Sequence, residues 1–136
     1  ERMFSGMEQH GISGTVWELS QGVSRWNFED LNLLSPDGTP RPLVDAIARP
    51  RLAALSGTLD EISWDTSARR FLARWYAEGE ASTRIALPGA YRFDDLGELS
   101  VFGEDVELAL EVPNVLSVDA PEHECVEIAF SLPRAL

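Results

Sequence analysis

The sequence predicts an α+β protein that is mainly β, with a short mixed segment followed by an antiparallel β-sandwich. Residues 1–57 have apolar residues at helical spacing on both sides of a short apolar run at 14–18, which is typical of a buried parallel strand between helices. From residue 58 onward the apolar period changes to two, as expected for short antiparallel strands. The change of period divides the chain into domains at 1–57 and 58–136.

The first segment is expected to be helix, strand, loop and helix. Met3, Phe4 and Met7 have helical spacing with no capping residue before them, so we expect the chain to begin inside a helix. A single parallel strand at 14–18 needs a neighbour on each side. The segment is therefore expected to be the end of a larger fold.

A long polar loop is expected at 20–39, and it closes in a turn at 35–38, where Pro and Gly occupy turn positions. The apolar residues within 43–47 then favour a helix that ends before Pro50.

The second segment is predicted to contain strands with apolar inner faces and acidic outer faces. A turn is expected at 65–67, where Asp, Thr and Ser follow one another. The alternating stretches are 62–65, 71–76, 83–87, 98–102, 106–112 and 126–132.

The net charge of −12 is unevenly placed along the chain. Residues 1–56 hold 7 acidic and 5 basic groups, whereas residues 57–136 hold 16 and 6. This surface disfavours nucleic acid and anionic membranes as partners, and no apolar run is long enough for a transmembrane segment. Cys125 is the only cysteine, so no internal disulfide forms, but this leaves the compartment undecided.

Several short motifs resemble a known family. These are Thr15-Val16-Trp17, the run Trp26-Asn27-Phe28-Glu29-Asp30-Leu31, Ala48-Arg49-Pro50 and Ser56-Gly57. They resemble the last barrel segment of endoglycosylceramidase-type glycosidases of glycoside hydrolase family 5. The resemblance implies that residues 1–57 are the C-terminal strand and helix of a (β/α)8 barrel, and that 58–136 are its C-terminal β-sandwich. The remainder of the barrel would then be the partner of this chain.

Trp17 is expected at the carboxyl end of the barrel strand, where ligand-facing residues gather. An indole there offers a flat apolar platform for a sugar ring, and the resemblance implies that the matching Trp lines the subsite of the cleaved glycosyl unit. The alternative is a core Trp that packs beneath the following loop.

Glu18 follows this Trp and is the one candidate for a catalytic carboxylate in the segment. Retaining glycosidases need two carboxyl groups about 5–5.5 Å apart. The resemblance places both on earlier barrel strands, so we expect no catalytic residue in this chain. Glu18 is instead expected to contact a substrate hydroxyl or to lie at the solvated rim.

Trp26 and Asn27, with Glu29 and Asp30, belong to the loop that would overhang the cleft and could hold sugar hydroxyls. Alternatively, Trp26 pins the loop by packing while Asn27 and Asp30 bind turn amides.

No metal site and no cofactor is expected. The run Glu122-His123-Glu124-Cys125 contains metal-type side chains, but consecutive strand residues point to opposite faces and no second cluster accompanies them. The acidic residues Glu104, Asp105, Glu107 and Glu111 are interpreted as a solvated strand face.

Two functions from different classes follow. The first is the C-terminal part of a retaining glycosidase acting on β-glycosides, including glycosylceramides, which is inactive alone. The second is a non-catalytic carbohydrate- or lipid-binding β-sandwich with residues 1–56 as a docking arm. The strand and loop at 14–31 favour the first, because a docking arm does not need a buried strand that ends in Trp.

Overall fold

The computed structural model describes residues 2–10, 33–41, 44, 47–88, 91–96 and 98–133. The chain divides into two compact units, Glu1–Ala48 and Arg49–Leu136. The elements are α1 (Arg2–Gln9), β1 (Arg51–Ala54), β2 (Gly57–Asp65), β3 (Arg70–Ala77), β4 (Thr83–Ala86), the 3-10 helix η1 (Phe93–Asp95), β5 (Leu99–Phe102), β6 (Glu107–Val112), β7 (Val115–Asp119) and β8 (Cys125–Ser131).

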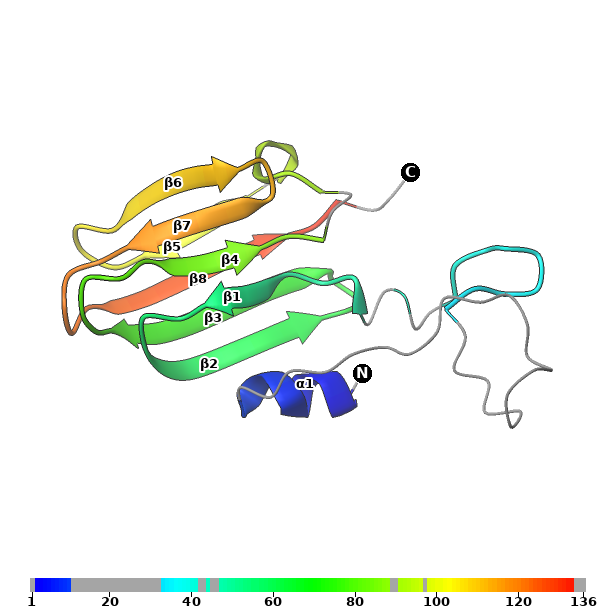
Figure 1. The fold of residues 1–136 in the computed structure, drawn as a ribbon, viewed down its shortest axis with the longest axis horizontal. Coiled ribbons are helices and arrows are strands. Elements are labelled where there is room, and N and C mark those ends of the chain that lie inside the picture. Colours follow the sequence, from blue (N-terminus) through cyan, green and yellow to red (C-terminus); the bar gives the residue numbers. More distant parts are fainter. Residues whose placement is uncertain are drawn as a thin grey trace. The chain divides into compact units, whose positions relative to one another are not determined.

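The second unit is built from two four-stranded sheets (Figure 1). The first sheet has the order β1-β4-β7-β6 and the second has the order β2-β3-β8-β5. Every strand pair is antiparallel, as the alternating sequence predicts. The predicted mainly β, antiparallel architecture is therefore confirmed.

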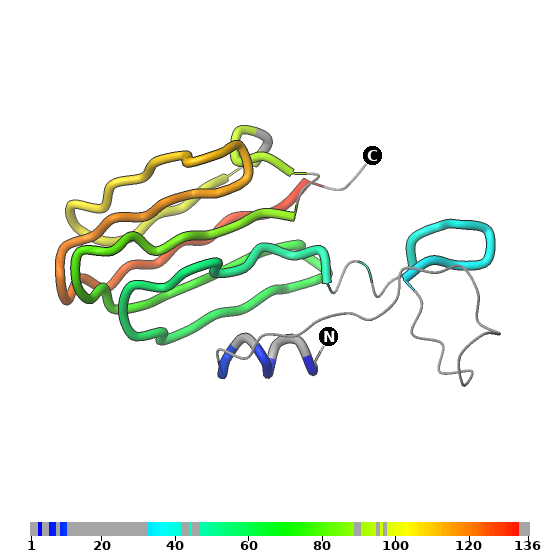
Figure 2. Tube along the Cα trace, viewed as in Figure 1, coloured from blue at the N-terminus to red at the C-terminus, as the bar shows by residue number. Residues whose placement is uncertain are grey.

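Several connections between consecutive strands cross from one sheet to the other, both at the edges and in the middle of the sandwich. The path of the chain can be followed in Figure 2. The β1–β2 link joins the two edge strands at one side of the sandwich, and the β5–β6 link joins the edge strands at the other. The β3–β4 and β7–β8 links join central strands. Each side of the sandwich is thus formed by two edge strands that are neighbours in sequence.

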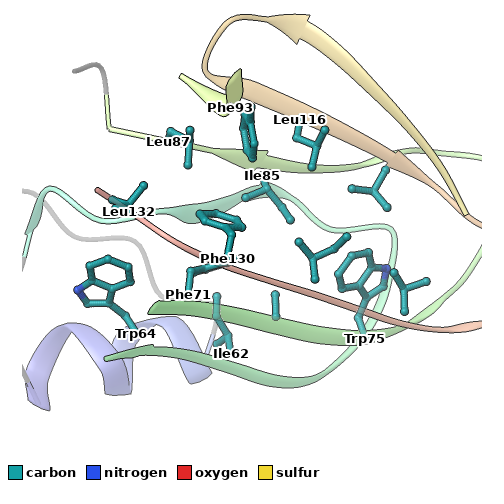
Figure 3. Packing of buried hydrophobic residues seen from close by; sticks show 14 residues of the cluster. Ile62, Trp64, Phe71, Trp75, Ile85, Leu87, Phe93, Leu116, Phe130 and Leu132 are labelled. Atoms are coloured by element: carbon teal, nitrogen blue, oxygen red, sulfur yellow. The ribbon is translucent and has the colours of Figure 1, made fainter. Parts of the chain in front are cut away.

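The core lies between the two sheets and is rich in aromatic side chains (Figure 3). Trp75 and Phe71 of β3 are both only 1% exposed. The ring of Phe130 lies 5.1 Å from that of Phe71 and 5.7 Å from that of Phe93, measured between centroids. These contacts join β3, β8 and η1, and such aromatic pairs stabilise a core beyond the area that they bury.

Two strands of the sandwich are absent from the prediction. β7 has only 5 residues and follows Pro113 and Asn114, so the sequence shows too few alternations to identify it. β1 has the sequence RLAA, which contains no β-branched residue. It is a strand because it pairs with β4, Leu52 lying opposite Ile85. This tertiary contact overrides the local preference.

The division into compact units falls between Ala48 and Arg49, whereas the sequence places the domain boundary at 57/58. The difference arises because β1 pairs within the first sheet. The origin of residues 1–57 in a barrel stays a prediction.

In the first unit, the predicted N-terminal helix is present as α1. The predicted turn at 35–38 is also present: the Gly38 amide donates to the Ser35 carbonyl oxygen at 2.8 Å, and Leu34 bridges Pro40. The Ala48 amide donates to the Val44 carbonyl oxygen at 2.7 Å, as in one helical turn. The predicted strand at 14–18 lies outside the described residues.

Candidate functional site

The residues predicted to bind sugar all lie outside the described part of the chain. They are Trp17, Glu18, Trp26 and Asn27, together with Glu29 and Asp30. Their role stays a prediction. The described polar and charged clusters belong to other parts of the chain, and their chemistry can be tested against that of a glycosidase.

Among the described residues, an ionic cluster with three carboxylates lies on the outer face of the second sheet, around Arg74 of β3. Its Nε donates to Asp60 Oδ2 at 2.6 Å, and its two terminal nitrogens lie 2.9 Å from Glu61 Oε2 and 3.2 Å from Glu127 Oε2. We call Arg74 and these three carboxylates the Arg74 cluster. It joins β2, β3 and β8.

A bulge in β2 explains why two consecutive carboxylates reach one guanidinium. The register between β2 and β3 shifts between Leu59 and Glu61, and both Asp60 and Glu61 are exposed while Ile62 is buried. Without the bulge, neighbouring strand residues would point to opposite faces. The bulge therefore places both carboxylates on the outer face.

The cluster raises the pKa of Arg74, first through the hydrogen bond to Asp60 and then through that to Glu127, while desolvation opposes the shift. The carboxylates surround a fixed cation on a sheet face, instead of facing each other across a substrate as in a retaining glycosidase. Because the groups are partly exposed, solvent screens the attraction. The arrangement is suited to joining strands and not to acid–base catalysis.

In the described part of the chain, the carboxyl groups of Asp37 and Asp65 have lowered pKa values. The pKa of Asp37 is lowered because its carboxylate accepts hydrogen bonds from the Thr39 hydroxyl and amide. The pKa of Asp65 is lowered by bonds from the Ala68 amide and the Ser67 hydroxyl. A general acid near neutral pH needs a raised pKa, so neither group has that property. Both stabilise turns.

A second polar contact lies where η1 approaches the start of β3. The Arg69 guanidinium donates to the Tyr91 hydroxyl at 2.7 Å, and its central carbon lies 5.6 Å from the centre of the Tyr91 ring. Arg69 has a φ of 52°, in the left-handed region. The contact ties the β2–β3 turn to the segment before η1.

Neither the Arg74 cluster nor the contact between Arg69 and Tyr91 was predicted from the sequence. The pairing of Arg74 with Glu61 could have been predicted from the sequence. The predicted turn at 65–67 places Asp65 opposite Arg70, and counting back along the hairpin places Glu61 opposite Arg74. Asp60 reaches Arg74 only because of the bulge, and no feature of the sequence predicts that bulge.

The run 122–125 is divided between a turn and a strand. His123 is exposed with a φ of 71°, and Glu124 Oε1 accepts a hydrogen bond from the Glu104 amide at 2.8 Å. Cys125 begins β8. In the described ranges no group of three His, Cys, Asp or Glu side chains could hold a metal ion, and no helix is long and apolar enough to cross a membrane.

No protein-family model matches the chain, and no curated protein matches it by sequence. Solved structures do match it by fold. Endo-glycoceramidase II from Rhodococcus sp. superposes with a TM-score of 0.66 at 23% identity, over 97% of this chain and 29% of that chain. A structure described as its ganglioside GM3 complex has a TM-score of 0.66 at 22% identity, over 97% and 28%.

Sterylglucosidase 1 of Cryptococcus neoformans is also similar, with a TM-score of 0.59 at 20% identity, over 82% of this chain and 20% of that chain. At these identities the likeness shows a shared fold. The chain spans less than a third of the length of each of these proteins.

Proposed function

We propose that this chain is the C-terminal part of a retaining glycoside hydrolase of the family 5 type that acts on β-glycosides, with glycosylceramides as the candidate substrates. One observation carries the proposal: the fold resembles that of Endo-glycoceramidase II over 97% of the chain, so the likeness extends beyond the sandwich. The motifs around Trp17 and Trp26 support the same assignment independently of the fold.

In this proposal the chain contributes binding groups and a structural domain. Trp17 stacks on the sugar ring, Glu18 contacts a substrate hydroxyl, and Trp26 and Asn27 close the subsite from the following loop. The sandwich is a structural domain that takes no part in the chemistry.

The chain is proposed to lack the catalytic carboxylates. A retaining mechanism needs a nucleophile and an acid/base about 5–5.5 Å apart, and both would come from barrel strands outside this chain. The Arg74 cluster does not substitute for them, because its carboxylates bind a guanidinium. Activity then requires the remainder of the barrel as part of the same polypeptide or as a partner.

Hydrolysis of an aryl β-glucoside and of glucosylceramide tests this proposal, assayed with the purified 136-residue chain and with a longer polypeptide that includes the preceding barrel. We expect turnover only with the longer polypeptide. Turnover by the chain alone that disappears in Glu18→Gln would make Glu18 catalytic and contradict the proposal. Glycan binding by the chain without hydrolysis by the longer polypeptide would favour the non-catalytic binding module.

A further inference from the structure

One side of the sandwich exposes several large apolar side chains. We call the side formed by the edge strands β5 and β6 the open side. Six of the nine exposed large hydrophobic residues in the described part of the chain belong to these two strands. They are Leu99, Val101, Phe102, Leu108, Leu110 and Val112.

The register shows that most of these side chains belong to the inner faces of the sheets. Leu108 and Leu110 lie opposite Val118 and Leu116, which are buried between the sheets. On β5, Leu99 and Val101 likewise lie opposite buried residues of β8. Residues directly opposite on neighbouring strands point to the same face. The open side therefore exposes apolar side chains that lie on the same faces of the sheets as the core residues.

The other side of the sandwich differs. There the inward-facing residues of β1 and β2 are covered: Leu52 and Leu59 are half-buried and pack on the core, while Ile62 and Trp64 are both 7% exposed. By contrast, Leu108 is 39% and Leu110 is 48% exposed. Each side of the sandwich has two edge strands. The exposure of apolar side chains on β5 and β6 is therefore not explained by their position at the edges of the sheets.

The backbone of β6 can accept a further strand. β6 is the last strand of the first sheet and pairs only with β7 among the described strands. An edge strand presents amide and carbonyl groups that pair readily with an added strand. The side chains of an added strand would point alternately toward the exposed Leu108 and Leu110 and toward the outer face.

The charged residues in the stretch of sequence that forms the open side are mostly acidic. No Lys or Arg occurs from residue 93 to 133, a stretch that includes β5 to β8. The same stretch contains the acidic residues Asp94, Asp95, Glu98, Glu104, Asp105, Glu107, Glu111, Asp119, Glu122, Glu124 and Glu127. Glu107 and Glu111 lie on β6 itself. Arg84 of β4 forms an ion pair with Glu111, with 2.6 Å between Nε and Oε1. A basic partner complements this surface.

We propose that the open side binds an extended polypeptide segment in which apolar residues alternate with Lys or Arg, and that the segment adds to the β6 edge as a further strand. Its apolar side chains cover Leu108 and Leu110, and its basic side chains face Glu107 and the neighbouring carboxylates. This interaction is separate from glycoside hydrolysis and does not depend on it.

Two other occupants fit less well. A second copy of this chain would bring a second net charge of −12 to the same surface. An anionic lipid surface would be repelled for the same reason. A segment with alternating basic and apolar residues complements the acidic charge of the open side and covers its exposed apolar side chains.

The probe is a synthetic labelled peptide of 6 residues, the length of β6, in which isoleucine alternates with lysine. Binding to the full chain is measured by fluorescence anisotropy. We expect binding of this peptide, and none of a serine–lysine or an isoleucine–glutamate peptide. A version with methylated backbone amides should also fail to bind, because it cannot pair with the strand edge.

Leu110→Thr should weaken binding about tenfold, because the apolar contact is lost while a strand-forming residue is kept. The matched control is Tyr76→Thr on the outer face of the second sheet, since Tyr76 and Leu110 are both 48% exposed. It should leave the affinity unchanged. Glu107→Gln should reduce the dependence of binding on salt without changing the melting temperature, which gives a readout independent of the core.

Equal binding of the serine–lysine peptide would overturn the proposal, because charge alone would then suffice. So would equal weakening by Tyr76→Thr and Leu110→Thr. Binding of phosphatidylcholine vesicles without peptide binding would assign the open side to lipid, and a concentration-dependent dimer would assign it to a second copy.

Discussion

Trp75 and Tyr76 are neighbours in β3, yet they lie in opposite environments. Trp75 is 1% exposed between the sheets, whereas Tyr76 is on the outer face. Trp75→Ala should lower the free energy of unfolding by about 3–5 kcal/mol, because it leaves a large cavity in the core. Tyr76→Ala should change it by no more than about 0.5 kcal/mol.

Urea unfolding of the chain and both variants, followed by tryptophan fluorescence and circular dichroism, measures this difference. A similar loss in the two variants would contradict the assignment of the two faces of β3.

Asp65 gives the turn between β2 and β3 a dependence on pH. Its pKa is lowered below the ordinary value of 3.8 by hydrogen bonds that its carboxylate accepts. A carboxyl group with a lowered pKa in the folded state contributes stability above its unfolded pKa, and this is lost as the pH falls through the folded pKa. The excess stability of the native chain over Asp65→Asn should therefore shrink at acid pH.

Unfolding free energies of the two proteins, measured at neutral pH and at several acid pH values, provide the comparison. A difference that stays constant down to the most acid pH would show that the carboxylate charge does not stabilise the turn.

At the scale of single elements, β1 is the clearest case of a strand that depends on tertiary pairing. A chain that begins at Arg49 keeps β1 beside β4, and we expect it to unfold cooperatively. A chain that begins at Thr58 loses the strand and the packing of Leu52, and leaves Ile85 at a new edge. It should be less stable by about 2 kcal/mol or more.

Thermal and urea unfolding of these two shortened chains compare the boundaries at 48/49 and 57/58 directly. Equal stability would support the predicted boundary at 57/58 and would show that β1 does not stabilise the folded sandwich.

Strands with a clean period of two could be predicted from the sequence, and so could the turns at 35–38 and 65–67. These signals are local: alternation reports the two faces of a strand, and Asp, Pro and Gly report turn geometry. β1 and β7 could not be predicted, since both are short and owe their conformation to neighbours. Alternation at 106–112 correctly indicated which residues face inward, but not that Leu108 and Leu110 stay exposed.

The contacts of the polar side chains could likewise be predicted only where a local pattern in the sequence determines them. The partnership of Glu61 and Arg74 follows from a hairpin whose turn is visible in the sequence, whereas Asp60 joins only through a bulge. The predicted sugar-binding residues Trp17 and Trp26 depend on a resemblance and lie outside the described residues.

At the scale of the whole molecule, the sandwich and the proposed sugar subsite differ in what they need in order to fold. The second unit contains its own core between two sheets. An isolated parallel strand would instead leave backbone groups unpaired, so the proposed subsite needs other barrel strands to be formed. The proposal therefore assigns folding to the sandwich and function to the complete barrel.

The most direct test is Trp17→Ala in the longer polypeptide that includes the barrel, with kcat/KM and the melting temperature measured on the same preparation. We predict that kcat/KM for a β-glucoside falls about 30- to 1000-fold, which corresponds to about 2–4 kcal/mol of transition-state binding, while the melting temperature stays near that of the native enzyme. A variant that melts early, having lost about 3–5 kcal/mol of stability, but keeps its kcat/KM would show that Trp17 is a core residue and would contradict the proposed sugar subsite.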